Sequence, residues 1–410
     1  MDILLAVQLR TPSDPWLPRL KAFECWNTTE ALIPFIPLLL SSKTIDIKAG
    51  FDEVTPAVAA ASIISRLSTL CPNLEHITLY DLPSDPVTIE AVSEMLIACN
   101  RDTLESCFVD SPLTEEAQEA VYRLPRLSRL WSVIRGPTSL PTVVLPNLTT
   151  IDVEYDHDLN WLAGFRGATL EKLEAITFRS ESEHIGDFLG AFESVALTTS
   201  APNTLSKLEF CTSRSWNPNY SALLLFNQLK EVKIEFSCTG GCPSKVDDDV
   251  VMCLAKAMPK LEILQLGDAP CATPTGVTVK GLIGLAHLCP HLSELCIHFQ
   301  AASLVEAAAS AATLSPSNGK PIVLRKDCAL TDLEVGEIPI PARSGSTVAH
   351  VLLLIFPHIL NVRFTDQDWK TVAETVKYFS RIATFVYHTG KAHLSCLTIG
   401  GYTSPGNTTV

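Results

Sequence analysis

The residues best suited to chemistry are soft metal ligands in two short segments. Cys238 and Cys242 have the spacing of a metal-binding knuckle. The denser group consists of His287, Cys289, His291, Cys296 and His298. A structural zinc site needs four such ligands. No second pair follows Cys242 closely, and a turn divides the second group between a helical and an extended segment. We therefore expect a surface loop at Cys238–Cys242, and neither a metal nor another cofactor.

Paired carboxylates, which can share acid and base roles in a cleft, occur at Asp152 and Glu154. Side chains two apart in an extended segment point to the same side, so these groups are expected on one open surface. The sequence contains no glycine-rich phosphate loop, nucleophile elbow or zinc-hydrolase motif. We predict that the chain is not an enzyme. The remote alternative is a hydrolase whose leucine-rich strands imitate repeats.

Composition narrows the class of partner. The 410 residues are 47% hydrophobic and carry a formal net charge of -14, which opposes binding to nucleic acid or to anionic membranes. The longest apolar runs fall far short of the roughly 20 residues that span a bilayer. Thirteen cysteines, mostly within apolar patterns, and a start without a signal-peptide pattern favour reduced thiols. We expect a cytoplasmic or nuclear protein.

A short sequence motif, here called the phrase, recurs along the chain and indicates the elements that must position these residues. It consists of a turn followed by Leu-x-x-apolar-x-apolar. Its clearest copies are Leu145 to Val153, Met258 to Leu266 and Cys289 to Ile297. The copies are anchored at Leu20, Leu74, Leu104, Leu127, Leu148, Leu173, Leu205, Leu229, Leu261, Leu292, Leu330, Ile359 and Leu394, with a degenerate one holding Ile45 and Ile47. From Leu74 onward, steps between anchors range from 21 residues (Leu127 to Leu148) to 38 (Leu292 to Leu330).

These lengths predict an irregular leucine-rich repeat. Each extended phrase turns its apolar residues to one side, and parallel stacking buries a ladder that no single repeat could bury. Helical periodicity lies between the strands at Ala57–Leu70, Val87–Cys99, Glu115–Leu124, Ile185–Leu197, Asp249–Met258, Val277–Cys289 and Trp369–Phe379. A helix that returns to a parallel strand makes a right-handed crossover. The fold expected is an α/β solenoid, a curved horseshoe with strands on the concave face and helices on the convex face.

The solenoid is predicted to be one domain over residues 1–410, with about a dozen or more repeats. Residues 311–324, which include Ser315, Pro316 and Gly319, are expected to form an insertion loop. Residues 401–410 are expected to be a disordered tail.

The cysteine-Pro-x-Leu turns and three longer segments resemble the leucine-rich-repeat region of fungal, mushroom-type F-box proteins. The segments are Pro18–Trp26, Gly164–Glu171 and Asp366–Thr375. The resemblance implies a substrate-receptor role in a ubiquitin ligase, with the repeats holding a protein substrate and an N-terminal F-box docking on a cullin adaptor. Residues 1–50 lack the helical opening of an F-box, and the first repeat already begins near Leu17. Adaptor binding would therefore need an F-box upstream.

Alternation along each phrase identifies the side chains that face away from the core. The expected binding residues on this concave face are Trp26, Tyr80, Phe108, Arg129, Trp131, Asp152, Glu154, Arg179, Lys207, Glu209, Glu231 and Lys233. Aromatic residues gather at the N-terminal end, and aromatic side chains are favoured at binding hot spots. The sequence thus predicts a protein-binding module of the F-box leucine-rich class. The alternative is a repeat scaffold or regulator unrelated to ubiquitin.

Overall fold

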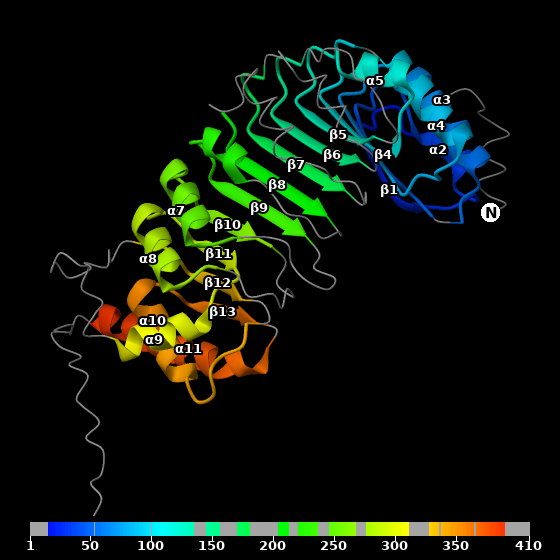
Figure 1. Cartoon of the computed structure of the whole chain (residues 1–410). Helices are drawn as coiled ribbons and strands as arrows, with labels where there is room; N and C mark the ends of the chain where they lie inside the picture. Colours follow the sequence, from blue (N-terminus) through cyan, green and yellow to red (C-terminus); the bar gives the residue numbers. More distant parts are fainter. Residues whose placement is uncertain are drawn as a thin grey trace, which may run out of the picture.

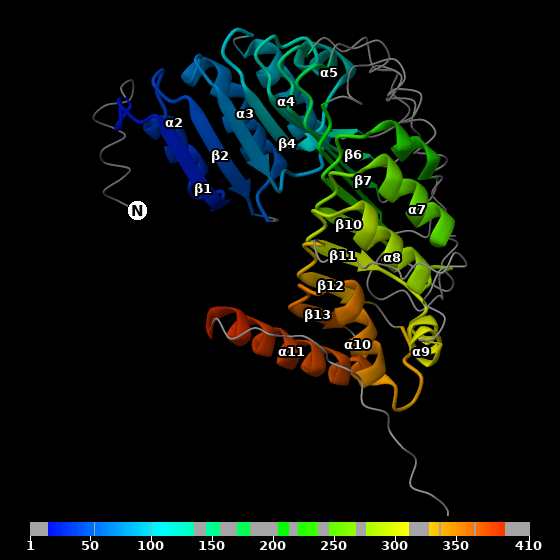
Figure 2. The same ribbon diagram turned by 90° about the vertical axis from the view of Figure 1, so that its left-hand side faces the viewer.

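The computed structural model describes residues 15–52, 54–99, 101–134, 145–155, 170–180, 204–212, 220–236, 246–267, 276–310, 328–335, 338–364 and 366–389. Within these residues a single sheet of 13 parallel strands runs in strict sequence order from β1 to β13. The sheet curves, with the strands on its inner side and the helices on its outer side (Figures 1 and 2). This arrangement is the predicted α/β leucine-rich-repeat solenoid.

The strands are short and evenly stacked. They are β1 (Ala22–Thr28), β2 (Asp46–Phe51), β3 (His76–Tyr80), β4 (Ser106–Pro112), β5 (Arg129–Ile134), β6 (Thr150–Tyr155), β7 (Ala175–Ser180), β8 (Lys207–Thr212), β9 (Glu231–Phe236), β10 (Ile263–Leu266), β11 (Glu294–Ile297), β12 (Asp332–Val335) and β13 (Asn361–Phe364).

The anchor residues explain where each strand begins. Twelve of the strands start two residues after a predicted anchor, as Thr150 of β6 follows Leu148. The anchor side chains from Leu74 to Ile359 are buried and Leu20 is half-buried; in β6 the next inward residues, Ile151 and Val153, are buried as well. In β2 the anchor position holds Thr44, which is fully buried and whose hydroxyl donates to the carbonyl of Leu20 at 3.0 Å. That hydrogen bond removes the cost of an unsatisfied hydroxyl in the core.

A ladder of hydrogen bonds joins the turns that precede the strands. The carbonyl of Ser128 accepts from the amides of Thr149 and Thr150, at 2.8 and 3.1 Å, and the same pattern recurs at Glu174. Hydroxyl side chains add a further bond, because Ser128 Oγ donates to the carbonyl of Glu105 at 3.0 Å. Each repeat is thus held mainly by its neighbours, as expected for a one-dimensional stack.

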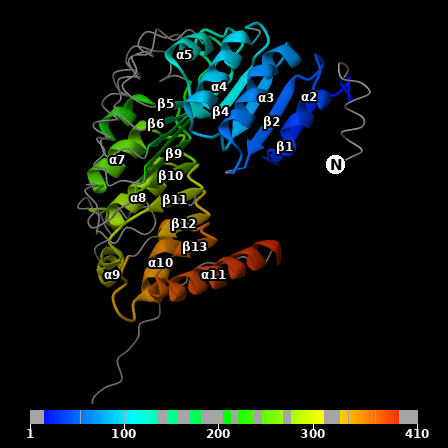
Figure 3. The same ribbon diagram turned by 90° about the vertical axis from the view of Figure 1, so that its right-hand side faces the viewer.

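The helices cover the outer side of the sheet (Figure 3). They are α2 (Ile36–Leu39), α3 (Ala57–Leu70), α4 (Pro86–Ala98), α5 (Glu115–Val121), α7 (Asp248–Ala257), α8 (Val279–Leu288), α9 (Ala301–Ala309), α10 (Gly345–Ile355) and α11 (Lys370–Thr389), with single 3-10 turns η1 (Ile33–Phe35), η4 (Tyr220–Leu225) and η5 (Gln367–Trp369). Six of the seven predicted helices are present; five lie near their expected bounds, and α11 continues to Thr389, beyond the predicted end at Phe379. Helices α2, α9 and α10 were not predicted.

Several helices begin with a side chain that caps the free backbone amides. Asp247 accepts from the amide of Val250 at 2.9 Å at the start of α7. The carboxylate of Asp248, one residue on, accepts from the amides of Thr278 and Gly281 at the start of α8. Carboxylates at helix N-termini are stabilised by the orphan amides and by the helix dipole. These contacts fix the spacing of neighbouring repeats on the outer side.

The C-terminal end of the stack is covered by α11. Its first turns pack on α10 and β13, with Trp369, Val372 and Val376 fully buried. The indole N–H of Trp369 donates to the carbonyl of Ile338 at 2.7 Å. The helix then runs past β13 toward the open side of the curve (Figures 2 and 3).

Some predicted features lie outside the described residues. These are the helix at Ile185–Leu197, the loop at Cys238–Cys242, the insertion loop at 311–324, the anchor Leu394 and the tail at 401–410. Within the described part of the chain, no helix combines the length and apolarity needed to cross a membrane.

Candidate binding surface

The inner side of the sheet, here called the strand face, carries the side chains that alternate with the core. Parallel pairing places one residue of every strand in a continuous central row. The row is Glu24, Lys48, Thr78, Phe108, Trp131, Asp152, Thr177, Glu209, Lys233, Gln265, Cys296, Glu334 and Arg363. All predicted binding residues lie in this row or two positions to either side of it, so the strand face is one continuous surface.

Four aromatic side chains meet at the N-terminal end of this face, and we call Trp26, Tyr80, Phe108 and Trp131 the aromatic row. Ring centroids are 5.4 Å apart between Trp26 and Tyr80 and 4.4 Å between Tyr80 and Phe108. Phe108 and Trp131 stack at 4.2 Å with an interplanar angle of 7°. Contacts of this kind stabilise by about 0.5–1.5 kcal/mol each beyond area burial, so the rings form a rigid ridge.

A glycine on β2 makes room for the first ring. A Cβ added to Gly50 would lie 3.0 Å from Cε3 of Trp26, closer than ordinary packing allows. The indole N–H of Trp26 donates to Glu24 at 2.7 Å, and Glu24 also pairs with Lys48 at 3.9 Å. The indole therefore lies across β2 and reaches Tyr80 on β3.

Exposure divides the aromatic row into accessible and covered parts. Trp26 is 51% exposed, Tyr80 and Phe108 are half-buried, and Trp131 is only 7% exposed. Trp131 holds an outward register position, but Phe108 stacks on it and Asp152 lies beside it in register. A partner therefore has access to the Trp26 end, while Trp131 supports the ridge from below. Arg129, two residues before Trp131, is exposed on β5.

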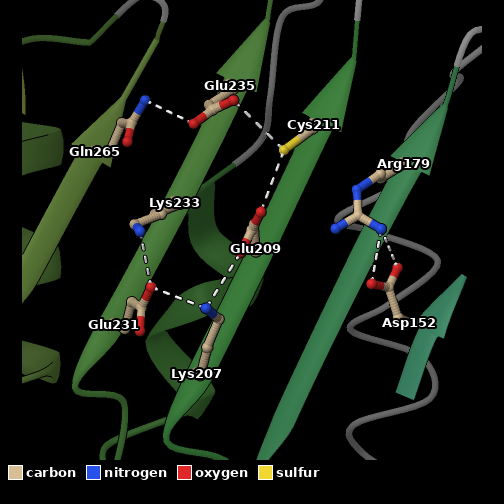
Figure 4. Close-up of polar contacts among 9 residues, drawn as sticks. All are labelled: Asp152, Arg179, Lys207, Glu209, Cys211, Glu231, Lys233, Glu235 and Gln265. Carbon is tan, nitrogen blue, oxygen red and sulfur yellow. Dashed lines mark hydrogen bonds and ion pairs between the residues drawn. The ribbon is translucent and has the colours of Figure 1, made fainter. Parts of the chain in front are cut away.

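The middle of the strand face is a network of ion pairs (Figure 4). On β7, Arg179 donates to both carboxylate oxygens of Asp152 on β6, each at 2.7 Å. Lys207 on β8 lies 3.1 Å from Glu231 and 3.3 Å from Glu209, and Lys233 also reaches Glu231 at 3.0 Å. Arg179 thus binds the carboxylate two positions before Glu154, its register neighbour on β6.

Burial and ion pairing shift the pKa values of these groups in opposite directions. Burial would raise the pKa of Glu231, but hydrogen bonds and charges of Lys233 and Lys207 outweigh it and lower the pKa. For Asp152, burial prevails over Arg179 and raises the pKa. Burial alone would lower the pKa of Lys207, and its pairing with Glu231 and Glu209 raises it instead. The lowered pKa of Glu231 and the raised pKa of Lys207 both favour the charged forms, so pairing stabilises this part of the network as ions.

Cys211 and Glu235, which were not among the predicted binding residues, complete this part of the surface. The Cys211 thiol lies 3.5 Å from Oε2 of Glu235 and 3.7 Å from Oε1 of Glu209. Burial, followed by these two carboxylates, raises the pKa of Cys211 to about 12. The thiol therefore stays protonated, and it can donate to only one carboxylate at a time. Strict alternation along β8 and β9 was the available signal for both residues.

The histidine and cysteine cluster does not converge. Cys289 is buried at the end of α8, Cys296 is buried on β11, and His298 is buried just after it. His287 is exposed in the last turn of α8, and His291 is exposed in the turn that follows. Across the part of the chain that the structure describes, no three His, Cys, Asp or Glu side chains are grouped so that they could hold a metal ion.

Comparisons with known proteins give only distant likenesses. No protein-family model and no curated protein matches the chain. Similar solved structures include the yeast Rad7–Elc1 complex, with a TM-score of 0.38 and 13% identity over 91% of this chain and 73% of that chain. A leucine-rich-repeat protein of Leptospira interrogans has a TM-score of 0.31 and 14% identity, over 88% and 98%.

The Drosophila Toll–Spätzle complex gives a TM-score of 0.30 and 11% identity, over 84% of this chain and 54% of that chain. Because global similarity at this level is weak, the fold is assigned from the repeated phrase and the ordered parallel sheet.

Proposed function

We propose that the chain is a protein-interaction module that binds a partner protein on its strand face, with the accessible end of the aromatic row as the anchor. The observation that supports this most strongly is the contact chain from Trp26 through Tyr80 to Phe108, on an open surface rather than in the core. Large exposed aromatic groups lower the solubility of a protein. They are also the side chains that contribute much of the binding energy at protein interfaces.

The rigidity of the aromatic row supports the same proposal. Its rings pack against one another, and Trp131 is already buried, so little side-chain freedom remains to be lost on binding. The ion pairs of β6–β9 likewise fix the adjoining charges. A preformed surface of this kind suits recognition of a folded protein or an extended segment.

We further propose that the partner is the substrate of a ubiquitin ligase, which the resemblance to fungal F-box proteins supports. The second candidate is a scaffold or regulator without a ubiquitin ligase, for which the same surface suffices. In either case we propose that the chain binds without catalysing a reaction. Capture of the full chain from native extract, probed for a cullin adaptor, discriminates the two: an adaptor recovered with the partner favours the ligase role, and a partner without adaptor favours the scaffold.

The binding surface is tested by Trp26→Ala combined with Tyr80→Ala. If the two rings act as hot spots, the free energy of binding to the captured partner weakens by at least about 2 kcal/mol, some thirtyfold in affinity. The chain should remain folded, because neither side chain is in the core. Isothermal titration with the purified partner measures the loss.

The matched control is Val58→Ala with Val87→Ala, which removes exposed apolar groups, 70% and 46% exposed, from α3 and α4 on the helical side. We expect this pair to leave binding unchanged. If the helical pair abolished binding and the aromatic pair did not, the proposed surface would be wrong.

A further inference from the structure

Most carboxylates in the middle of the strand face are paired with a cation from the chain itself. Asp152 has Arg179, and Glu231 has Lys207 and Lys233. Glu235 on β9 is different. Its contacts are the amide of Gln265 at 2.9 Å and the thiol of Cys211 at 3.5 Å, both neutral donors. Among the described residues no basic side chain reaches it.

Glu235 lies on the surface that a bound partner would cover. Its side chain is half-buried on the strand face, between Cys211 of β8 and Gln265 of β10 (Figure 4). A partner that covers this surface removes the water that now solvates the carboxylate. A carboxylate buried with neutral donors alone loses several kcal/mol of solvation, whereas a cation brought to it offsets that loss.

The remaining charges favour the same kind of partner. Carboxylates on the strand face are Glu24, Asp46, Asp110, Asp152, Glu154, Glu209, Glu231, Glu235, Glu294, Asp332 and Glu334. The basic side chains are fewer, namely Lys48, Arg129, Arg179, Lys207, Lys233 and Arg363. A face with surplus negative charge attracts basic segments and repels acidic ones.

We propose that the partner segment carries an arginine or lysine that pairs with Glu235, in addition to an apolar group on the aromatic row. This inference rests on the proposed function and identifies the chemistry of its partner. Arginine is favoured over lysine because its planar guanidinium can bind a carboxylate through two hydrogen bonds.

The geometry sets the distance between the two groups of the partner. Tyr80 of β3, in the accessible part of the aromatic row, and Glu235 of β9 are separated by six strand-to-strand steps. At about 4.8 Å per step the span is roughly 29 Å. An extended segment covers this span in about nine residues, and a helical one in about nineteen. The partner should therefore show one of these two spacings.

Selection from a displayed library of random peptides of about 20 residues, long enough for either spacing, tests the proposal on the purified full chain. We expect the enriched peptides to share an apolar residue and an arginine or lysine at one of the two spacings. A selected peptide should lose about five- to tenfold in affinity for Glu235→Gln, which keeps the shape but removes the charge. The matched control is Glu262→Gln, which breaks an exposed ion pair with Lys230 at the turn before β10.

The outcomes separate the two proposals. The pairing is supported if the affinity falls with Glu235→Gln but not with Glu262→Gln. It is supported further if the loss caused by Glu235→Gln disappears when the basic residue of the peptide is replaced by a neutral one. Peptides weakened by Trp26→Ala with Tyr80→Ala but indifferent to Glu235→Gln overturn the pairing and leave the proposed function standing. Selected peptides that respond to neither change, or a library that yields no binder of the strand face, overturn both.

Discussion

Replacing Ile151 by aspartate should unfold the middle of the solenoid, while the same change one residue earlier, at Thr150, should be tolerated. Ile151 is 2% exposed and packs in the core ladder of β6. Removing its buried surface costs about 2–3 kcal/mol. A carboxyl group without a partner in that place adds about 1–3 kcal/mol. The sum, about 3–6 kcal/mol, is a large part of the 5–15 kcal/mol that stabilises a typical protein.

Thr150→Asp is the matched control because it carries the same loss of strand propensity. Thr150 is half-buried on the strand face and is the register neighbour of Arg129 on β5. An aspartate there remains solvated beside a cation, so we expect a change within about 1 kcal/mol.

Equilibrium urea denaturation, followed by far-ultraviolet circular dichroism, measures both variants. Because each repeat depends on its neighbours, Ile151→Asp is expected to lower the midpoint and also the slope of the transition, as part of the stack unfolds first. Equal destabilisation by the two substitutions would refute the inward and outward assignment of β6, and with it the strand face.

Two further predictions concern contacts between repeats. Glu231→Gln should lower the urea midpoint near pH 7 but not in acid: ion pairs lower the pKa of Glu231 in the folded chain, so its stabilisation is complete above the unfolded pKa and is lost as pH falls through the folded one. A destabilisation that persisted unchanged below about pH 3 would contradict this cause. Gly281→Ala should destabilise by about 1–2 kcal/mol despite its better helix propensity, because the new Cβ would meet Oδ1 of Asp248 at 2.5 Å. The loss should shrink in an Asp248→Ala background; strict additivity in a double-mutant cycle would show that the two sites are independent.

The strands could be predicted from sequence because their signal is local and repeated. An anchor such as Leu148 and the alternating pair Ile151 and Val153 occupy fixed offsets, and the same offsets recur in repeat after repeat. Even β2, whose anchor is Thr44, was found through the alternation of Ile45 and Ile47. A pattern of apolar residues does not reveal a buried threonine. Thr44 can lie in the core because its hydroxyl donates a hydrogen bond to the carbonyl of Leu20.

Two of the missed helices, α9 and α10, lack the signals on which the others were found. α9 is alanine-rich and has no side-chain cap, and α10 ends in an almost continuous apolar run, Val351–Ile355. A helix that is apolar on most sides shows no clear period of 3.6 residues.

Which residues form the strand face was predictable, but their contacts were not. Alternation placed Phe108 and Trp131 outward, whereas their stacking depends on the register of β4 with β5. Arg179 lies beside Glu154 in register and yet binds Asp152. These contacts depend on how each side chain is oriented relative to the neighbouring strand. The sequence of a single repeat does not determine that orientation.

The division of the strand face follows from the local nature of contacts in a stack of repeats. Outward side chains contact mainly those of nearby strands, so a change at one position disturbs little beyond its neighbours. Lys207 and Lys233 can therefore pair with Glu231 while Glu235, two outward positions farther along β9, contacts only the neutral side chains of Gln265 and Cys211. Pairs neutralised within the chain add little net attraction for a partner, because their charges already compensate one another. The binding energy is then expected at the accessible aromatic rings, and the choice of partner at Glu235, which no basic side chain of the described residues reaches.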